Sequence, residues 1–322
     1  MVVNHFSTVN APPEFASPPL CVDLDGTLCR TDTLAESCLR WLLRSPLNTI
    51  PILRALLKGR AYLKQRLAQE NLINATLLPY NGAIIEWLNN ERASGRKLVL
   101  ATAANRALAE KVANYLGCFD MVIGSDATRN LKGIAKAEEL KRLFPHSGFD
   151  YVGDSAADIP VWNQAQCAFG VNPPKRLLRA VPKLSAVRIT KPSLFSSLVR
   201  ACRPHQWAKN ALLFVPVIAS HRILDLRTDI IVTISCVAFC LVASSAYLIN
   251  DIVDLENDRS NPRKKARPVA NGDLSIGTTM GASILLLAAG LGLSVAVSVP
   301  SFGAFWPTTA LHSPTLITSS ES

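Results

Sequence analysis

The stretch CVDLDGTLCR, residues 21–30, decides the fold of the first half of this 322-residue chain. Apolar residues lead directly into Asp23 and Asp25, and the turn-forming Gly26 follows at once. This order is typical of a buried strand that ends in a turn and presents two carboxylates. Open α/β sheets bind their ligands at the carboxyl ends of their strands. The stretch therefore predicts an α/β fold with a ligand site at the end of its first strand.

Three later motifs supply further polar residues in an order that fits one site. The candidates are Thr102 at the end of KLVLATAAN, Lys132 and Lys136 in NLKGIAKAEEL, and Asp154 and Asp158 in YVGDSAADIP. A lone DxDGT can arise by chance, whereas four such elements in this order are a specific signal. We therefore expect these residues to meet at one edge of a sheet.

The pattern of apolar residues between the motifs predicts the layout of the first half. Residues 32–92 carry apolar residues at helical spacing, which predicts a helical cap over the end of the first strand. Strand and helix patterns then alternate, which indicates a mostly parallel sheet with right-handed crossovers. The expected elements are a strand to Thr102, a helix over 105–116, a strand near 119–123, a helix over 135–143, a strand to Gly153, a helix over 156–164 and a strand over 168–171.

A DxDGT strand with a distant GDSxxD motif resembles the haloacid dehalogenase (HAD) superfamily of phosphohydrolases over residues 17–172. The resemblance implies a Rossmann-like domain that hydrolyses a phosphate ester with Mg²⁺. It assigns Asp23 as nucleophile, Asp25 as acid and base, Thr102 and Lys136 as phosphate-binding residues, Asp23 and Asp154 as Mg²⁺ ligands, and Asp158 as support for the metal site. The alternative is a degenerate phosphatase fold that only binds a ligand. Residues 1–16 are expected to be disordered and residues 173–192 to be a linker.

A second informative stretch joins an apolar run, residues 230–250, to the acidic cluster NDIVDLENDR, residues 250–259. The run has about 20 residues, the length that crosses a bilayer as a helix. Asp251, Asp254 and Asp258 recur at steps of three and four, so they share one face if the helix continues. Mg²⁺ commonly bridges carboxylates to phosphate oxygens. The junction predicts a metal–diphosphate site at the mouth of a membrane cavity; the alternative is ordinary solvated acids.

Three apolar spans are expected in the second half, over 211–220, 230–250 and 274–299. The first is short for a crossing, and residues 193–207 before it have the pattern of an amphipathic surface helix. The loop RSNPRKKAR, residues 259–267, is strongly basic and so is expected on the cytoplasmic side of the inner membrane. Two crossings precede this loop, which predicts that the first domain is also cytoplasmic.

Composition supports a membrane protein that binds anions. The formal net charge is +10, 49% of the residues are hydrophobic, and the basic residues gather at 175–209 and 259–267, next to apolar spans. This distribution fits membrane lipid headgroups and polyphosphates, and we expect no nucleic-acid partner. The eight cysteines are scattered without a C-x-x-C pair, which indicates small buried side chains in a reducing compartment.

Residues 203–273 resemble the UbiA-type integral-membrane prenyltransferases through RPHQWAKN, YLINDIVDLENDR and NPRKKARPVANG. A HAD domain ahead of such a sequence resembles the branch of the family whose donor is a polyprenyl phosphate and whose acceptor is phosphoribosyl diphosphate. The resemblance implies an all-α transmembrane bundle. It assigns Asn250, Asp251, Asp254 and Asp258 to Mg²⁺ on the diphosphate, and Lys209, Asn210 and Arg267 to phosphate oxygens. The alternative for Lys209 is an interfacial lysine.

The chain departs from that family pattern near its end. The family has more transmembrane helices and a second acidic motif, whereas the stretch after Pro300 becomes rich in Ser, Thr and Pro. We expect a partial membrane domain over 193–300, an atypical tail over 301–322 and a truncation or frameshift near Val299. The predicted function is a prenyltransferase with a fused phosphohydrolase, its transferase half incomplete; the alternatives are a membrane-tethered phosphatase alone or a non-catalytic fragment. The phosphate ester, the prenyl chain and the oligomeric state stay open.

Overall fold

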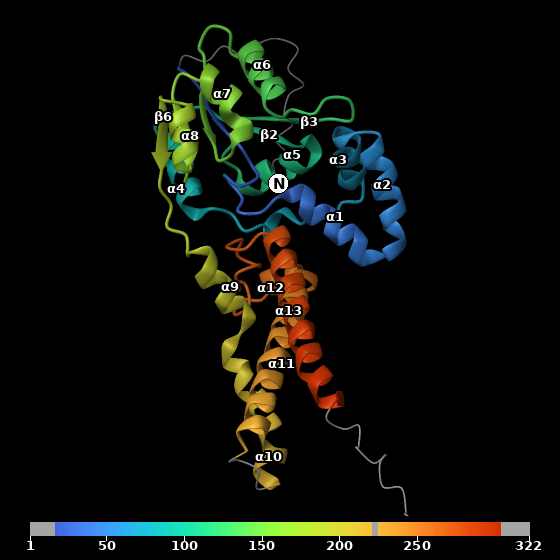
Figure 1. Ribbon diagram of the computed structural model, residues 1–322. Coiled ribbons are helices and arrows are strands. Elements are labelled where there is room, and N and C mark those ends of the chain that lie inside the picture. The colour runs from blue at the N-terminus through green and yellow to red at the C-terminus, as the bar shows by residue number, and fades with distance from the viewer. Residues whose placement is uncertain (1–16, 221–224, 304–322) are drawn as a thin grey trace, which may run out of the picture. The chain divides into compact units, whose positions relative to one another are not determined.

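The computed structural model describes residues 17–220 and 225–303, with the backbone alone over 298–303. The chain forms two compact units, one made of Met1–Leu198 with Asp251–Thr278 and the other of Val199–Asn250 with Thr279–Ser322 (Figure 1). The expectations for residues 1–16 and 304–322 lie outside the described residues.

A six-stranded sheet with every strand pair parallel forms the centre of the first unit, in the order β3-β2-β1-β4-β5-β6. The strands are β1 (Leu20–Val22), β2 (Leu98–Asn105), β3 (Met121–Ser125), β4 (Asp150–Gly153), β5 (Ala168–Val171) and β6 (Leu184–Val187). Strand β1 lies between β2 and β4, so the chain segments that follow these three strands leave the same edge of the sheet. The expected parallel α/β domain is confirmed.

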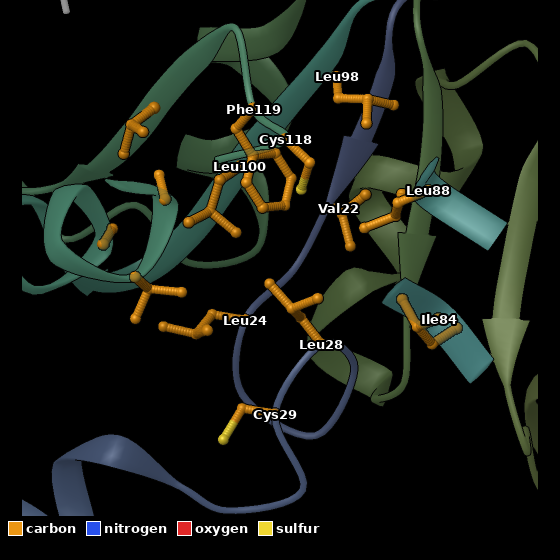
Figure 2. Packing of buried hydrophobic residues seen from close by; sticks show 14 of the residues in the cluster. Val22, Leu24, Leu28, Cys29, Ile84, Leu88, Leu98, Leu100, Cys118 and Phe119 are labelled. Carbon is orange, nitrogen blue, oxygen red and sulfur yellow. The ribbon is translucent and has the colours of Figure 1, made fainter. Parts of the chain in front are cut away.

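Both faces of the sheet are buried because neighbouring residues of a strand point to opposite sides. Leu20 and Val22 of β1 face one apolar core, whereas Cys21 between them faces the other. Helices α4 (Gly82–Ala93) and α5 (Arg106–Leu116) cover the first face. Helices α6 (Ile134–Leu143), α7 (Ile159–Gln164) and α8 (Lys175–Ala180) cover the second. Figure 2 shows the first core, with Val22 and Leu100 from the sheet and Ile84 and Leu88 from α4.

The helical cap consists of α1 (Thr33–Arg44), α2 (Thr49–Leu57) and α3 (Arg60–Gln69), drawn together in blue in Figure 1. Its own small core contains Trp41, Leu63 and Leu67. The cap was expected to reach residue 92, but α4 packs on the sheet instead. Ile84 and Leu88 lie one helical turn apart and both are fully buried in the first core, so α4 belongs to the sheet layer.

The stretch expected to be a linker over 173–192 contains α8 and β6. Strand β6 pairs with β5 and forms the edge of the sheet, beside α8 in Figure 1. Leu177 and Leu184 are buried in the second core, which explains why this stretch folds onto the domain. The linker expectation is therefore wrong for residues 175–187.

The second unit is helical, as expected. Its elements, some of which extend into the first unit, are α9 (Leu194–Cys202), the 3-10 helix η4 (Pro204–Phe214), α10 (Val215–Ala219), α11 (Leu226–Val253) and α13 (Ile276–Gly303). Over the described residues, the helices long and apolar enough to cross a membrane are two, Leu226–Val253 and Ile276–Val297. The first expected span, 211–220, is divided between η4 and the five-residue α10, so it does not form a helix of that length.

Helices α11 and α13 approach each other closely at small residues. A Cβ added at Gly290 would lie 2.7 Å from Val242 Cγ2 and 2.8 Å from the carbonyl oxygen of Ala238. The hydroxyls of Ser245 and Ser283 lie 2.9 Å apart between the two helices. Small residues and hydroxyl hydrogen bonds are typical of helix pairs in membranes.

Candidate active site

The first candidate residue, Asp23, follows β1 directly. Its backbone N–H donates to the carbonyl oxygen of Val152 at 3.0 Å, which continues the pairing of β1 with β4. Its carboxylate accepts from the N–H of Leu24 at 2.8 Å, and the residue is 8% exposed. Asp25 leaves the strand on the cap side, where its Oδ1 accepts from the N–H of Thr33 at 2.9 Å. The short β1 strand thus delivers both carboxylates to the cap side of the sheet edge.

Lys136 is the cation at the centre of this site. Its Nζ lies 3.1 Å from Asp23 Oδ1 and 3.6 Å from Asp158 Oδ1, and the residue is 2% exposed. Nζ also donates to the hydroxyl of Tyr151 at 2.7 Å, and that hydroxyl donates to Asp158 Oδ1 at 2.8 Å. Lys136, Tyr151 and Asp158 thus form a buried hydrogen-bond network. Because these groups are bonded to one another, the network holds Lys136 in one position.

Tyr151 was not predicted from the sequence, where it is one of the apolar-looking residues of a strand. The strand periodicity shows only that it faces the same side of the sheet as Cys21. No local signal indicates that its hydroxyl reaches Lys136, which comes from α6 on another part of the chain.

Three carboxylates gather beside Lys136. Asp23, Asp154 and Asp158 each offer an oxygen atom, and these atoms lie within 4.8 Å of one another. A Cβ added at Gly26 would lie 2.2 Å from Asp154 Oδ2, so glycine is what allows Asp154 to approach. Asp158 Oδ2 is already bonded by the N–H of Ser155 at 3.1 Å and its hydroxyl at 3.2 Å. The group can hold a metal ion, with Asp158 fixed in place by the protein.

Burial raises the pKa values of three carboxyl groups in this site. Burial raises the pKa of Asp25 to about 7 and, with the nearby Asp23 charge adding to it, that of Asp154 to about 7. Burial also raises the pKa of Asp23, although Lys136 partly opposes this. Burial would lower the pKa of Lys136, but the Asp23 and Asp158 carboxylates outweigh it and raise the pKa. Such a concentration of negative charge favours a bound cation.

A pocket of about 370 Å³ opens above these residues. Besides the carboxylates and Lys136 it is lined by the basic residues Arg30, Arg60, Lys64 and Lys132. Lys132, the lesser of the two predicted lysines, is exposed there and does not contact Asp23 within salt-bridge distance, whereas Lys136 does. Of the two predicted lysines, Lys136 is therefore the one that lies beside Asp23.

Thr102 lies inside β2 rather than at its end, because the strand continues to Asn105. The residue is 1% exposed, and its hydroxyl accepts from the N–H of Ala104 at 3.0 Å. The neighbouring Ala103 lines the pocket. In this structure the expected phosphate-binding hydroxyl is turned to the backbone of its own strand.

The second predicted site differs from its expectation. Helix α11 ends at Val253, and Asp254 precedes a separate short helix, α12 (Leu255–Ser260), so the three acids do not follow one continuous helix. Asp251 and Asp258 are buried at 1% and 0% exposure, whereas Asp254 is exposed.

Two basic residues of the following loop neutralise the buried acids. Arg267 Nη1 lies 2.6 Å from Asp258 Oδ2 and 3.5 Å from Asp251 Oδ1, and Lys264 Nζ lies 3.8 Å from Asp258 Oδ1. The predicted proximity of Arg267 to the acids is present, but as ion pairs with them. The basic loop thus folds back onto the acids that lie on either side of the helix interruption.

Three more predicted residues of this site, Lys209, Asn210 and Asn250, belong to the second unit. Lys209 and Asn250 have exposed side chains. Asn210 faces α11, where its Nδ2 donates to Cys240 Sγ at 3.2 Å. In the described structure Asn210 therefore acts in helix packing.

Comparisons with protein families confirm both resemblances. The family model described as haloacid dehalogenase-like hydrolase matches residues 20–162, and that of the UbiA prenyltransferase family matches residues 211–311. Each match covers the motifs from which its resemblance was inferred, except that RPHQWAKN, residues 203–210, lies wholly ahead of the UbiA match.

Several curated proteins are similar to parts of the chain. The uncharacterized protein y4nM of Sinorhizobium fredii is 34% identical over 86% of this chain and 54% of its own length. The decaprenyl-phosphate phosphoribosyltransferase of Corynebacterium glutamicum is 41% identical over 32% of this chain and 31% of its own length. The nodulation protein NoeC of Azorhizobium caulinodans is 42% identical over 30% and 31%. The chain thus spans about half of y4nM and about a third of the other two.

Solved structures are similar to about half of the chain. A protein of unknown function from Bordetella pertussis covers 54% of this chain and 99% of its own, at 14% identity and a TM-score of 0.43. A phosphoserine phosphatase, solved as a phospho-aspartyl intermediate analogue, covers 56% and 97% at 18% identity and a TM-score of 0.39.

Proposed function

We propose that this chain, in which a HAD-like hydrolase domain precedes a UbiA prenyltransferase-family segment, hydrolyses phosphate monoesters at Asp23 with Mg²⁺. The observation that carries the proposal is the buried Lys136 Nζ, 3.1 Å from Asp23 Oδ1. A phosphate dianion is repelled by a carboxylate unless positive charge lies beside both. Lys136 supplies that charge at the position where the phosphoryl group would bind.

The side chains account for both chemical steps. Asp23 attacks phosphorus, the bond from phosphorus to the alcohol oxygen breaks, and that oxygen takes a proton from Asp25. Water then gives a proton to Asp25 and attacks phosphorus, which breaks the aspartyl–phosphate bond and releases inorganic phosphate. Because burial raises the pKa of Asp25 to about 7, this carboxyl can both hold and release a proton near neutral pH.

The carboxylates fit Mg²⁺, which prefers oxygen ligands. Asp23 and Asp154 would hold the ion, and Asp158 would support them, because its oxygens are engaged by Tyr151 and Ser155. Bound Mg²⁺ would supply further neutralisation of the phosphate charge.

Hydrolysis of p-nitrophenyl phosphate by the full chain in detergent tests this function. With Mg²⁺ we expect turnover that Asp23→Asn reduces by at least about 1,000-fold, because the nucleophile is removed. The control is Asp229→Asn, which removes a carboxylate in the first turn of α11. Unchanged turnover in Asp23→Asn would eliminate Asp23 as nucleophile, and no turnover in the parent chain would favour the ligand-binding alternative.

Prenyl transfer is the second candidate function, and the family match over residues 211–311 favours it. We infer that Asn250, Asp251, Asp254 and Asp258 hold Mg²⁺ on a polyprenyl phosphate or diphosphate, and that Lys209, Asn210 and Arg267 bind phosphate oxygens. The buried Asp251 and Asp258 beside Arg267 support this, because a cation and an anionic ligand can exchange for the ion pairs seen there. Formation of a lipid-linked phosphoribose from polyprenyl phosphate and phosphoribosyl diphosphate, lost in Asp254→Ala, is the test.

The proposed location is the cell inner membrane, with the hydrolase domain in the cytoplasm. Two apolar helices of membrane length and the UbiA match indicate a membrane protein. The basic loop and the hydrolase domain belong to the same compact unit, so both are expected on one side. Basic loops favour the cytoplasmic side.

A further inference from the structure

Residues 251–278 lie outside the hydrolase match but pack within the hydrolase unit. The contact is centred on Glu36 of α1, which is fully buried. Its Oε1 accepts from Arg259 Nη1 at 2.8 Å and from Arg40 Nη2 at 2.9 Å. Arg259 Nε in turn donates to the carbonyl oxygen of Ala270 at 2.9 Å. A buried carboxylate is stable only when paired in this way, so the segment has a defined position on the domain.

The same segment places a turn against Arg30. Gly272 has φ of +79°, and a Cβ there would lie 2.5 Å from Arg30 Cβ, so the turn fits closely over this residue. The next residue, Asp273, places its Oδ1 3.6 Å from Arg30 Nη1. Asn271 fixes Asp273 through its Oδ1, which accepts from the Asp273 N–H at 2.9 Å, and its Nδ2, which donates to Asp273 Oδ2 at 3.0 Å.

Arg30 is itself a wall residue of the Asp23 pocket. The other cations of this pocket divide into two groups. Lys136 is engaged with Asp23, and Lys64 donates to the carbonyl oxygen of Ala103 at 2.5 Å and to Asn130 Oδ1 at 2.8 Å. Arg30, 28% exposed in its side chain, and the exposed Arg60 and Lys132 also line the pocket and, over the described residues, form no salt bridge with its aspartates. The pocket therefore has basic side chains besides Lys136, the one that pairs with Asp23, and these can contact a second phosphate group of a ligand.

We propose that Arg30 binds a second phosphate group of the ligand, and that Asp273 is the positioning residue that holds Arg30 toward the pocket. The guanidinium matches a phosphate with paired N–H donors, and a carboxylate behind it reduces the number of rotamers it can adopt. The preferred ligands are thus phosphate esters that carry two phosphates. Turnover of such an ester rests on the proposed phosphohydrolase function, whereas its binding rests on the pocket alone.

Binding by calorimetry tests the proposal on the full chain in detergent with Mg²⁺. Asp23→Asn is the background, so that the probe is not hydrolysed. The probes are fructose 1,6-bisphosphate and fructose 6-phosphate, which differ by one phosphate. We expect the bisphosphate to bind about tenfold more tightly, as a charge-assisted contact provides. Arg30→Gln is expected to remove this preference, Asp273→Asn to reduce it several-fold, and Arg30→Lys to retain part of it.

The control is Glu110→Gln, which removes a surface ion pair with Arg106 away from the pocket and is expected to leave the preference unchanged. The proposal is overturned if the background variant binds both probes equally, or if Asp273→Asn weakens both equally, as a merely structural role would. If the preference behaves as expected but the parent chain hydrolyses no ester, the phosphohydrolase function falls and the second phosphate site stands.

Discussion

At Gly26 the chain turns with φ of +77°, and this turn decides how closely Asp154 approaches Asp23. The residue meets two separate demands. Its positive φ is a backbone conformation that residues with a Cβ atom rarely adopt. Because glycine has no Cβ, the Asp154 carboxylate can occupy the space beside it. The space beside Gly26 thus sets where Asp154 lies in the group of three carboxylates, Asp23, Asp154 and Asp158.

Gly26→Ala is expected to lower phosphate-ester turnover by about 100-fold, because Asp154 must move away from the new methyl group. Gly95→Ala is the matched control, since Gly95 also has a positive φ, +87°, but a Cβ there meets nothing within 4 Å. Both variants are expected to lose about 1–2 kcal/mol of unfolding free energy from backbone strain, measured in urea. Equal turnover in the two variants would show that the approach of Asp154 is irrelevant to catalysis.

Tyr151→Phe is expected to reduce turnover by about tenfold and to raise the Mg²⁺ concentration needed for half-maximal rate, because groups that orient metal ligands have effects of this size. The change removes the hydroxyl that joins Lys136 to Asp158. Steady-state rates across a Mg²⁺ titration measure both effects. Tyr115→Phe is the control, a half-exposed ring stacked on Tyr80. An unchanged Mg²⁺ dependence in Tyr151→Phe would contradict the role given to the network.

At the scale of elements, close packing at small residues marks the faces at which the apolar helices α11 and α13 are in contact. Both helices are apolar over most of their length, and they meet at small residues and at the hydroxyls of Ser245 and Ser283. Gly290 lies at that contact, whereas a Cβ at Gly292 would meet nothing within 4 Å.

Gly290→Leu is expected to lower the thermal midpoint of the chain in detergent, since an added side chain at a tight contact costs about 1–3 kcal/mol. Gly292→Leu carries the same added volume and is expected to leave the midpoint unchanged. The measurement is thermal unfolding followed by light scattering in one detergent. A loss of similar size in both variants would mean that added bulk, rather than this contact, is responsible.

At the scale of the whole molecule, Glu36 and Arg259 are 223 residues apart in sequence and form a buried ion pair. This pair makes the loop after α12 part of the hydrolase unit. A chain cut before the membrane segment would keep every catalytic residue but would leave Glu36 without its Arg259 partner. Removing one partner of a buried pair leaves a charge whose burial is uncompensated.

Residues 1–190 expressed alone are therefore expected to hydrolyse p-nitrophenyl phosphate but to unfold at lower urea concentration than the hydrolase unit of the full chain. The expected deficit is about 3 kcal/mol, the lower end for breaking a buried pair, because Arg40 still contacts Glu36. Glu36→Gln is expected to stabilise the fragment and to destabilise the full chain. If Glu36→Gln changed the unfolding free energy of the fragment and of the full chain in the same direction, the stabilising role of the Glu36–Arg259 ion pair would be contradicted.

The side of the membrane is a whole-molecule property that a single cysteine tests. Ser260→Cys in a Cys167→Ser background is expected to resist a membrane-impermeant thiol reagent in intact cells and to react after lysis, because the positive-inside rule predicts a cytoplasmic loop. Ser260 is exposed, and Cys167 is the exposed cysteine among the described ones. Ready labelling in intact cells would place the hydrolase domain on the outer side.

Local pattern alone was enough for the strand before Asp23 and for the apolar runs of α11 and α13. It also picked out Lys136, Asp154 and Asp158, which lie close to Asp23 in the structure, while their catalytic roles stay predictions. Strand alternation, helix periodicity and the length of an apolar run depend only on neighbouring residues, so the sequence carries them directly. The same local pattern misled at residues 173–192, whose prolines and basic residues resemble a linker although Leu177 and Leu184 are buried against the sheet.

Only the tertiary structure decided what meets at the sites. It brought Tyr151 to Lys136, turned Thr102 toward its own strand, broke the acidic helix at Asp254 and set Asp273 against Arg30. The contacts of Tyr151 with Lys136 and of Asp273 with Arg30 join residues far apart in sequence, and a buried charge is stable only where such a contact pairs it. No local spacing encodes that requirement.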